Sequence, residues 1–144
     1  ARQTEANYPG QVRSVIRFDP SLSRRIYGSA DAILIPSRYE PCGLAQMIAM
    51  RYGCVPIARA TGGLRDTIVD NERGDHATGF LFTEPLPDAL AESIRRALRV
   101  YADPERWQVL QRNGMAQDFS WDRSARQYVA LYQQLVASKL PASI

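Results

Sequence analysis

The sequence has few cysteines, one histidine, one lysine and no long apolar run. Cys42 and Cys54 are its only cysteines, no CxxC pair occurs, and His76 is its only histidine. Four zinc ligands cannot be assembled from these residues and a disulfide scaffold is excluded, so we predict no metal site and two free thiols that are buried or half-buried. No apolar run approaches the roughly 18 residues that span a bilayer, and residues 1–5 lack the apolar stretch of a secretion signal. These absences predict a soluble, cytoplasmic protein.

The basic residues are almost all arginines and are scattered along the chain. They outnumber the acidic residues by 18 to 15, and Lys139 is the only lysine. Arg24–Arg25 and Arg95–Arg96 are the only basic doublets, and no basic run is interleaved with aromatic residues as a groove for single-stranded nucleic acid requires. The sequence therefore predicts a solvated arginine-rich surface, with neither nucleic acid nor membrane as a partner. A face that binds polyanions is the alternative.

The 144 residues suffice for one domain with a buried core, and apolar runs alternate with helical patterns along the first part of the chain. Strands are expected over residues 12–18, 32–35, 55–58 and 79–82, and helices over 21–29, 44–52, 64–70 and 86–101 and after 104 and 120. This alternation predicts an α/β fold, with a Rossmann-like parallel sheet, flanking helices and a helical C-terminal tail. Ligands of such sheets bind outside the carboxyl ends of the strands.

The strongest local signal is the segment Glu40–Leu44, which lies between the predicted strand 32–35 and a helix. Gly43 allows close backbone approach, and the N–H groups of the following helical turn are free to face a ligand. Helix N-termini favour phosphate oxygens, whereas the Glu40 carboxylate can accept hydrogen bonds from neutral hydroxyls. A phosphate beside such an acceptor indicates a sugar phosphate. The alternative is that Glu40 only caps the helix and Gly43 only fits a tight loop.

Thr61, Gly62 and Gly63 repeat this arrangement after the next strand, where a hydroxyl lies beside a glycine pair that opens a helix. Because the two strands are neighbours, the amides of both loops would face one crevice. The alternative is an ordinary strand-to-helix turn. GxGxxG, P-loop, HExxH and GxSxG motifs do not occur, so dehydrogenases, kinases, zinc proteases and serine hydrolases lack support.

Several segments together resemble the C-terminal half of bacterial glycogen synthases and plant starch synthases, in order and with that family's spacing. These segments are Pro36–Leu44, Met50–Ile57, Thr61–Leu64 with Asp66 and Thr67, Gly79–Phe80 and Asp118–Trp121. The resemblance implies the two-domain GT-B fold and the transfer of glucose from ADP-glucose, or UDP-glucose, to the non-reducing end of an α-1,4-glucan with retention of configuration. It also implies that the reaction needs no metal and no cofactor besides the nucleotide-sugar donor.

The same resemblance implies roles for individual residues. Glu40 contacts the donor glucose and is needed for catalysis, and the backbone amides of Cys42, Gly43 and Leu44 hold the glucose hydroxyls and the distal phosphate. Their fixed N–H dipoles would stabilise the departing nucleotide diphosphate. Phe18 lies where the family places an aromatic ring against the base, and the alternative is an ordinary core phenylalanine.

Some features depart from the family. Ala45 stands where threonine is common, and Ile48 where tyrosine or histidine is usual, so a phosphate contact and a ribose contact lack their residues. The family's diphosphate-binding arginine and lysine belong to a segment upstream of residue 1. We therefore expect residues 1–120 to be a donor-binding domain that is incomplete at its N-terminus, and the isolated chain to be inactive.

Residues 121–144 correspond to a helix that, in the family, crosses back to pack on the N-terminal domain. That domain is an expected partner, and we expect the helix face of Tyr128, Tyr132 and Leu135 to be either exposed or covered by another copy of the chain. Two other functions stay open. The chain could be a non-catalytic module that binds nucleotide sugars or glucan or serves assembly, or part of another retaining GT-B transferase, such as one that makes sucrose phosphate or trehalose phosphate.

Overall fold

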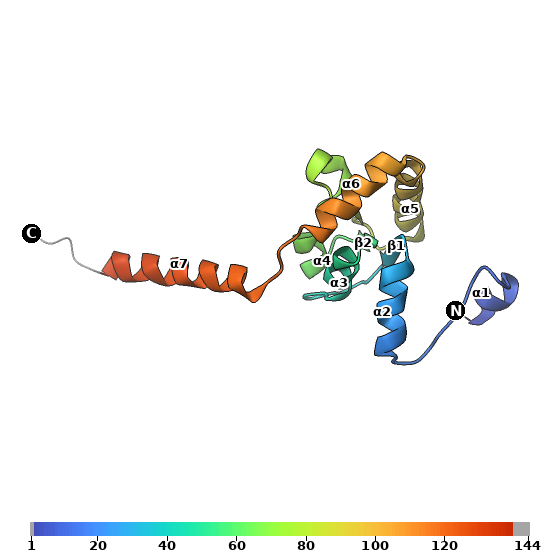
Figure 1. Ribbon diagram of the computed structural model, residues 1–144, viewed down its shortest axis with the longest axis horizontal. Helices are drawn as coiled ribbons and strands as arrows, with labels where there is room; N and C mark the ends of the chain where they lie inside the picture. The colour runs from blue at the N-terminus through green and yellow to red at the C-terminus, as the bar shows by residue number, and fades with distance from the viewer. Residues whose placement is uncertain (1, 140–144) are drawn as a thin grey trace, which may run out of the picture.

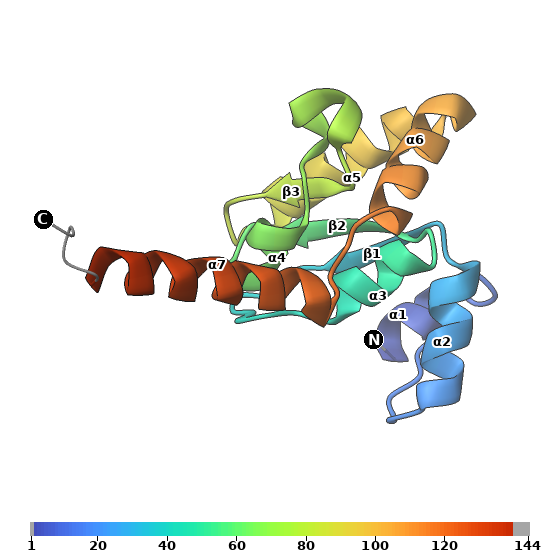
Figure 2. The same cartoon turned by 60° about the vertical axis from the view of Figure 1, so that its left-hand side comes forward.

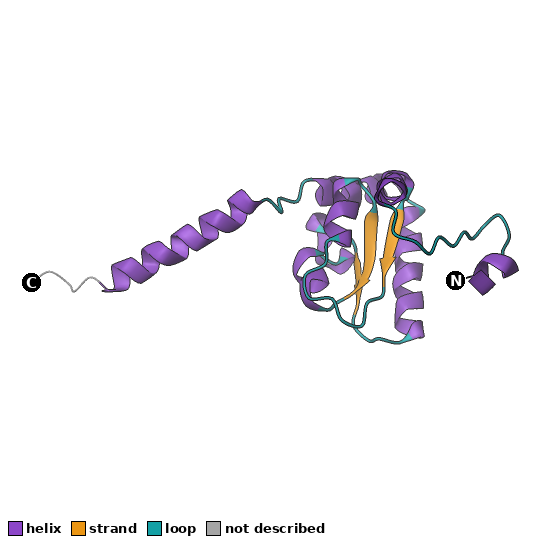
Figure 3. Ribbon diagram, turned by 90° about the horizontal axis from the view of Figure 1, so that it is seen from below, coloured by secondary structure: helices purple, strands orange, loops and turns teal. Residues whose placement is uncertain are grey.

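A computed structural model describes residues 2–139, in which a small parallel sheet lies between two layers of helices (Figure 3). The strands β1 (Ala32–Ile35), β2 (Val55–Arg59) and β3 (Phe80–Phe82) lie in the order β1-β2-β3. Both ladders are parallel, with Ala32 opposite Val55 and Ile57 opposite Phe80. The predicted α/β sheet with flanking helices is therefore confirmed.

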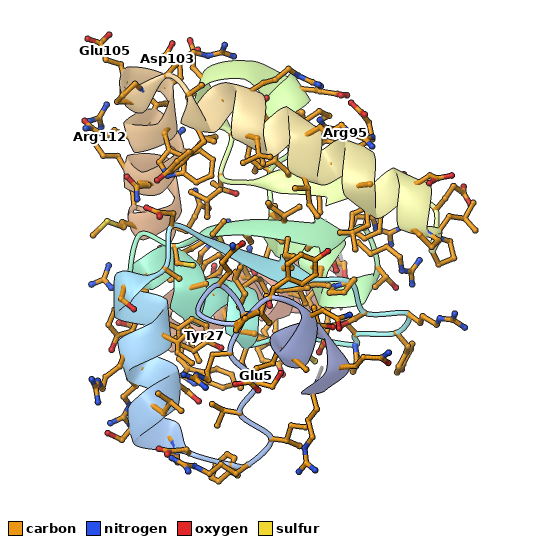
Figure 4. The ribbon with its side chains drawn as sticks, turned by 90° about the vertical axis from the view of Figure 1, so that its right-hand side faces the viewer. Glu5, Tyr27, Arg95, Asp103, Glu105 and Arg112 are labelled. Carbon is orange, nitrogen blue, oxygen red and sulfur yellow. The ribbon has the colours of Figure 1, made fainter. Side chains whose placement is uncertain are left out.

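Helices connect and flank these strands (Figure 1). In chain order they are α1 (Arg2–Asn7), α2 (Pro20–Ser29), α3 (Ala45–Arg51), α4 (Gly62–Thr67), the 3₁₀ helix η1 (Asn71–His76), α5 (Pro87–Tyr101), α6 (Pro104–Met115) and α7 (Trp121–Lys139). The Asp19 carboxylate accepts a hydrogen bond from the Leu22 N–H at 2.9 Å, and Asp103 accepts from the N–H groups of Glu105 and Arg106 at the start of α6 (Figure 4). A proline follows each of these aspartates, where its missing N–H is not needed, so both predicted helix starts are confirmed.

Apolar side chains fill both sides of the sheet. One cluster lies between the sheet and helices α5 and α6. In it the Trp107 ring stacks on Phe80 with centroids 6.3 Å apart and meets Tyr101 edge-on at 5.0 Å. The other cluster lies on the side of α3 and α4. Its buried members are Ile35, Ala58, Leu64 and Ile68. Because both sides are covered, the strands are apolar at consecutive positions rather than at alternate ones.

The predicted strand over residues 12–18 is wrong. This segment joins α1 to α2 and pairs with no strand of residues 2–139, and its Ile16 side chain is exposed. An extended segment becomes a strand only where a neighbour supplies hydrogen-bond partners, and β1 pairs with β2 alone. β1 is thus an edge strand, and its Leu34 is 50% exposed.

Arg96 of α5 departs from the predicted solvated arginine surface. Its guanidinium donates two hydrogen bonds to the Asp70 carboxylate, at 2.8 and 2.9 Å, and its side chain is only 21% exposed. Asp70 also caps η1 and accepts from the Leu81 N–H, so this ion pair joins α5, η1 and β3. Arg95 and Arg112 point outward, as predicted (Figure 4).

Helix α7 projects away from the rest of the chain (Figure 1), and only its beginning lies near the domain, beside α3 and α4 (Figure 2). Tyr128 is 60% exposed, Tyr132 61% and Leu135 50%. The apolar face of α7 is therefore open to solvent, which is one of the two expected arrangements. None of the described helices is long and apolar enough to cross a membrane.

Candidate functional site

The loop between β1 and α3 lies at the carboxyl end of β1, where parallel sheets bind ligands. Arg59, the last residue of β2, is hydrogen-bonded to the beginning of this loop. Its guanidinium donates to the backbone carbonyl of Ser37, 2.8 Å from Nε, and to that of Arg38. The neighbouring strand thus fixes the start of the loop, while the side chain of Leu44 at its end is exposed.

The Glu40 carboxylate in this loop is half-buried and, among residues 2–139, has one weak hydrogen bond. The Ser37 hydroxyl donates to its Oε2 at 3.4 Å, which is long for a bond between a hydroxyl and an oxygen. Among the residues that the structure describes, no ion pair neutralises Glu40. The carboxylate is therefore neither buried in the core nor occupied by a neighbouring cation, and it can accept hydrogen bonds from a ligand.

Gly43 sets the shape of the loop. Its φ of +69° lies in the left-handed region, which glycine adopts without strain, and a Cβ added to it would lie 2.5 Å from the Oε1 atom of Gln46. Within residues 2–139, the N–H groups of Cys42, Gly43 and Leu44 donate to no protein acceptor. The loop therefore carries three backbone donors in the same short segment as the Glu40 carboxylate.

Gly62 and Gly63, at the start of α4, pack closely against the loop between β1 and α3. The Gly63 N–H donates to the carbonyls of Glu40, at 3.3 Å, and Pro41, at 3.1 Å, and a Cβ added to Gly63 would collide with the Cys42 carbonyl. Gly62, with a φ of +43°, packs equally closely on the Glu40 carbonyl. The prediction that the amides of both loops are free for a ligand therefore requires correction at Gly63, whose N–H is bonded within the protein.

Phe18 and Thr61 are the remaining predicted donor-binding residues. Phe18 lies before α2 and is 94% exposed, so the alternative of a core phenylalanine is wrong. Thr61 is the N-cap residue of α4 and is half-buried, and its side chain makes no capping hydrogen bond. Contact of Phe18, Thr61 or Gly62 with a nucleotide sugar stays a prediction.

A cavity of about 570 Å³ lies beside α3, against the end of α6 and the segment before α7. Its wall includes Ile48 of α3, Tyr52 just after this helix, and Phe119. Ile48 is one of the two positions, with Ala45, at which we expect this chain to depart from the family that it resembles. It offers an apolar wall and no hydrogen-bond partner for a ribose.

The two thiols differ in their surroundings. Both are free, but Cys42 is exposed and Cys54 is buried, so the prediction of buried or half-buried thiols is confirmed for Cys54 and wrong for Cys42. Burial raises the pKa of the Cys54 thiol to about 11, and the Asp31 carboxylate adds to this rise. Cys54 therefore stays protonated near neutral pH, where it is a poor nucleophile.

Gln46 belongs to the site, and sequence reasoning did not identify it. Its side chain is fully buried in the first turn of α3, and its amide group donates to the Gly43 carbonyl at 2.9 Å. The signal that could have identified Gln46 is a polar residue beside Ala45 and Met47, in a helix that packs on the sheet.

Comparison with known proteins places these features in a family. Residues 3–114 match the family described as Glycosyl transferases group 1. The chain is 51% identical to glycogen synthase 2 of Nitrosococcus oceani, over 96% of this chain and 29% of that protein. It is 53% identical to the glycogen synthase of Myxococcus xanthus, over 92% of this chain and 27% of that protein. The chain thus spans less than a third of the length of these curated relatives.

Solved structures agree with this result. The catalytic domain of starch synthase IV from Arabidopsis thaliana, bound to ADP and acarbose, matches with a TM-score of 0.80 at 37% identity, over 94% of this chain and 29% of that one. A sucrose-phosphate synthase from Thermosynechococcus elongatus matches with a TM-score of 0.66 at 34% identity, over 94% of this chain and 33% of that one. The predicted partial GT-B fold and the resemblance to glycogen and starch synthases are confirmed. The chain therefore belongs to the glycosyl transferases of group 1.

Proposed function

We propose that this chain supplies the donor-binding part of a glucosyltransferase of the glycogen and starch synthase type. The observation that carries the proposal is the 51% identity to a glycogen synthase over 96% of the chain, because a match of that extent includes the loop of Glu40. The chain covers 29% of that relative. The activity is therefore proposed for a protein that also contains the relatives' remaining parts, including an N-terminal domain, and that works in the cytoplasm.

In the proposed reaction, glucose passes from ADP-glucose to the non-reducing end of an α-1,4-glucan with retention of configuration, without a metal. Glu40 accepts hydrogen bonds from the glucose hydroxyls and so orients the sugar. The N–H groups of Gly43 and Leu44 donate to the sugar and the distal phosphate. Because these dipoles are fixed by the fold, they stabilise the negative charge that develops on the departing nucleoside diphosphate. Cys42 contributes its backbone amide and not its thiol.

Titration of the chain with ADP, UDP, ADP-glucose and a maltooligosaccharide tests this proposal. We expect ADP-glucose and ADP to bind with a Kd of about 1 mM or lower, and more tightly than UDP, as measured by isothermal titration calorimetry. Binding of the oligosaccharide with no binding of any nucleotide would instead support a glucan-binding module without a donor site.

A second candidate is a transferase that makes sucrose phosphate, because the chain is also 34% identical to a sucrose-phosphate synthase. The identities of 51% and 53% to glycogen synthases favour the first candidate. Preference for UDP over ADP in the same titration would identify UDP-glucose, the other donor that the resemblance implies, as the donor of this chain.

The exposed face of α7 leads to a prediction about assembly. A helix that packs on nothing gains no stability from tertiary contacts, and an apolar stripe of this kind marks an interaction surface. We propose that two copies of the isolated chain associate through the face of Tyr128, Tyr132 and Leu135. Replacing Tyr128 and Tyr132 together with glutamate should convert the dimer into a monomer, as measured by sedimentation velocity.

The control is the double replacement of Gln133 and Gln134 with glutamate, which adds the same charge at exposed positions of α7. It should leave the dimer intact. A wild-type chain that sediments as a monomer at every concentration would overturn this prediction.

A further inference from the structure

We propose that Gln46 is a positioning residue of the donor-binding loop, which directs the N–H groups of Gly43 and Leu44 outward. This inference rests on the function proposed above, since it says how two of the backbone donors of that site are held in place. Gln46 itself is fully buried and does not reach the surface. It acts through the loop and does not touch the substrate.

The side-chain amide of Gln46 joins the loop before α3 to helix α4. Its Nε2 atom donates to the Gly43 carbonyl at 2.9 Å, to the Thr67 hydroxyl at 3.0 Å and, more weakly, to the Cys42 carbonyl at 3.4 Å. The Thr67 hydroxyl in turn donates to the Gly63 carbonyl. The atom that faces these acceptors must be the nitrogen, because carbonyl oxygens cannot donate.

Each of the two carbonyls that Gln46 holds shares a peptide bond with an N–H group, so these contacts also fix the direction of that N–H group. In a trans peptide the C=O and N–H groups point in opposite directions, and the described residues contain no cis peptide bond. Because Gln46 holds the Cys42 carbonyl inward, the Gly43 N–H points outward. Because it holds the Gly43 carbonyl inward, the Leu44 N–H points outward as well. Neither of these two N–H groups donates to an acceptor within residues 2–139.

The surroundings of Gln46 indicate that it orients the loop and does not merely fill space in the core. The Oε1 atom of Gln46 is buried without a hydrogen-bond partner, which is unfavourable, and an apolar side chain of the same length would avoid that loss. The loop also approaches Gln46 closely, since a Cβ at position 43 would lie 2.5 Å from Oε1 and 2.8 Å from Nε2. The polar contact to the loop therefore accounts for a glutamine at this site, whereas burial alone does not.

The substitution Gln46→Met tests the inference, because methionine has a similar length and no donor. We measure the affinities of ADP and AMP, which differ by the distal phosphate that the loop amides are proposed to hold. The wild type should prefer ADP, and Gln46→Met should lose about tenfold of this preference, the equivalent of one hydrogen bond to a charged group. The ratio of the two affinities cancels a general loss of folded protein, so a merely structural role would leave it unchanged.

Gln111→Met is the matched control. Gln111 also donates from Nε2 to a backbone carbonyl, that of Gly53 at 2.9 Å, but it lies on α6. The Gln111→Met variant should be less stable than the wild type and should keep the wild-type ratio of ADP affinity to AMP affinity. A folded Gln46→Met chain with an unchanged ratio would overturn the inference.

A measurement on the wild-type chain tests the inference without any substitution. The side-chain amide protons of Gln46 should exchange with solvent far more slowly than those of the exposed Gln133, as read by nuclear magnetic resonance. Slow exchange supports the inference even if Gln46→Met does not fold, and fast exchange contradicts it. If the wild type binds neither nucleotide, the proposed function fails, and slow exchange still supports the role of Gln46 in orienting the loop.

Discussion

Replacing Glu40 with alanine should weaken the binding of ADP-glucose by about 10- to 100-fold and leave thermal unfolding nearly unchanged. The substitution removes the acceptor for the glucose hydroxyls, and a hydrogen bond to a charged group contributes about 1.5–3 kcal/mol. Stability should be kept because, within residues 2–139, the Glu40 side chain has a single hydrogen bond, the long one from Ser37. Calorimetric titration measures the affinity, and differential scanning calorimetry measures the unfolding midpoint.

Glu84→Ala is the control for this substitution, since it removes the same charge from an exposed position just after β3. It should bind ADP-glucose as the wild type does. ADP provides a second control, because it lacks the sugar and Glu40→Ala should therefore keep its affinity for ADP. If Glu40→Ala bound ADP-glucose as tightly as the wild type, Glu40 would have no role in the donor site.

Gly63→Ala should lower the free energy of unfolding by about 3 kcal/mol and the unfolding midpoint by about 10 °C. The new Cβ would collide with the Cys42 carbonyl and lie 2.8 Å from the Cys42 Cα atom, and backbone atoms cannot rotate out of the way. Relief requires the two loops to separate, which breaks the bonds from the Gly63 N–H to the carbonyls of Glu40 and Pro41. Donor affinity should therefore fall together with stability, unlike in Glu40→Ala.

Gly28→Ala makes the same chemical change where space is available. Gly28 lies in α2, and its Cβ would make an ordinary contact, 3.6 Å from the Tyr52 ring. Alanine is the better helix former, so this variant should be more stable than the wild type by about 0.5–1 kcal/mol. Equal unfolding midpoints for Gly63→Ala and the wild type would show that the two loops are not packed against each other in solution.

The central strands and the two proline-marked helix starts could be predicted because each depends on a short stretch of sequence. The run 32–35 is apolar without interruption, and Asp19 and Asp103 each precede a proline. The segment 12–18 also contains residues that favour strands, such as Val15 and Ile16, yet it forms no strand, because a strand also needs a partner that no local pattern reveals.

Some features of the candidate site could likewise be predicted from the sequence, and others could not. The position of Glu40 follows from the order of strand, loop and helix, and it could be predicted. The use of the Gly63 amide could not, because it depends on the contact between two loops that are separated in the chain by α3 and β2. The burial of Arg96 could not be predicted for a related reason, since only the fold brings Asp70 to it.

The edge position of β1 also bears on how the chain behaves in concentrated solution. The outer N–H and C=O groups of an edge strand can template the addition of a further strand, and natural edges often carry a lysine that opposes this. β1 reads Ala-Ile-Leu-Ile and has no charged residue, with half of Leu34 open to water. Aggregation of this chain would therefore be expected to begin by backbone pairing along β1, and a charged side chain at Leu34 would be the most direct protection against it.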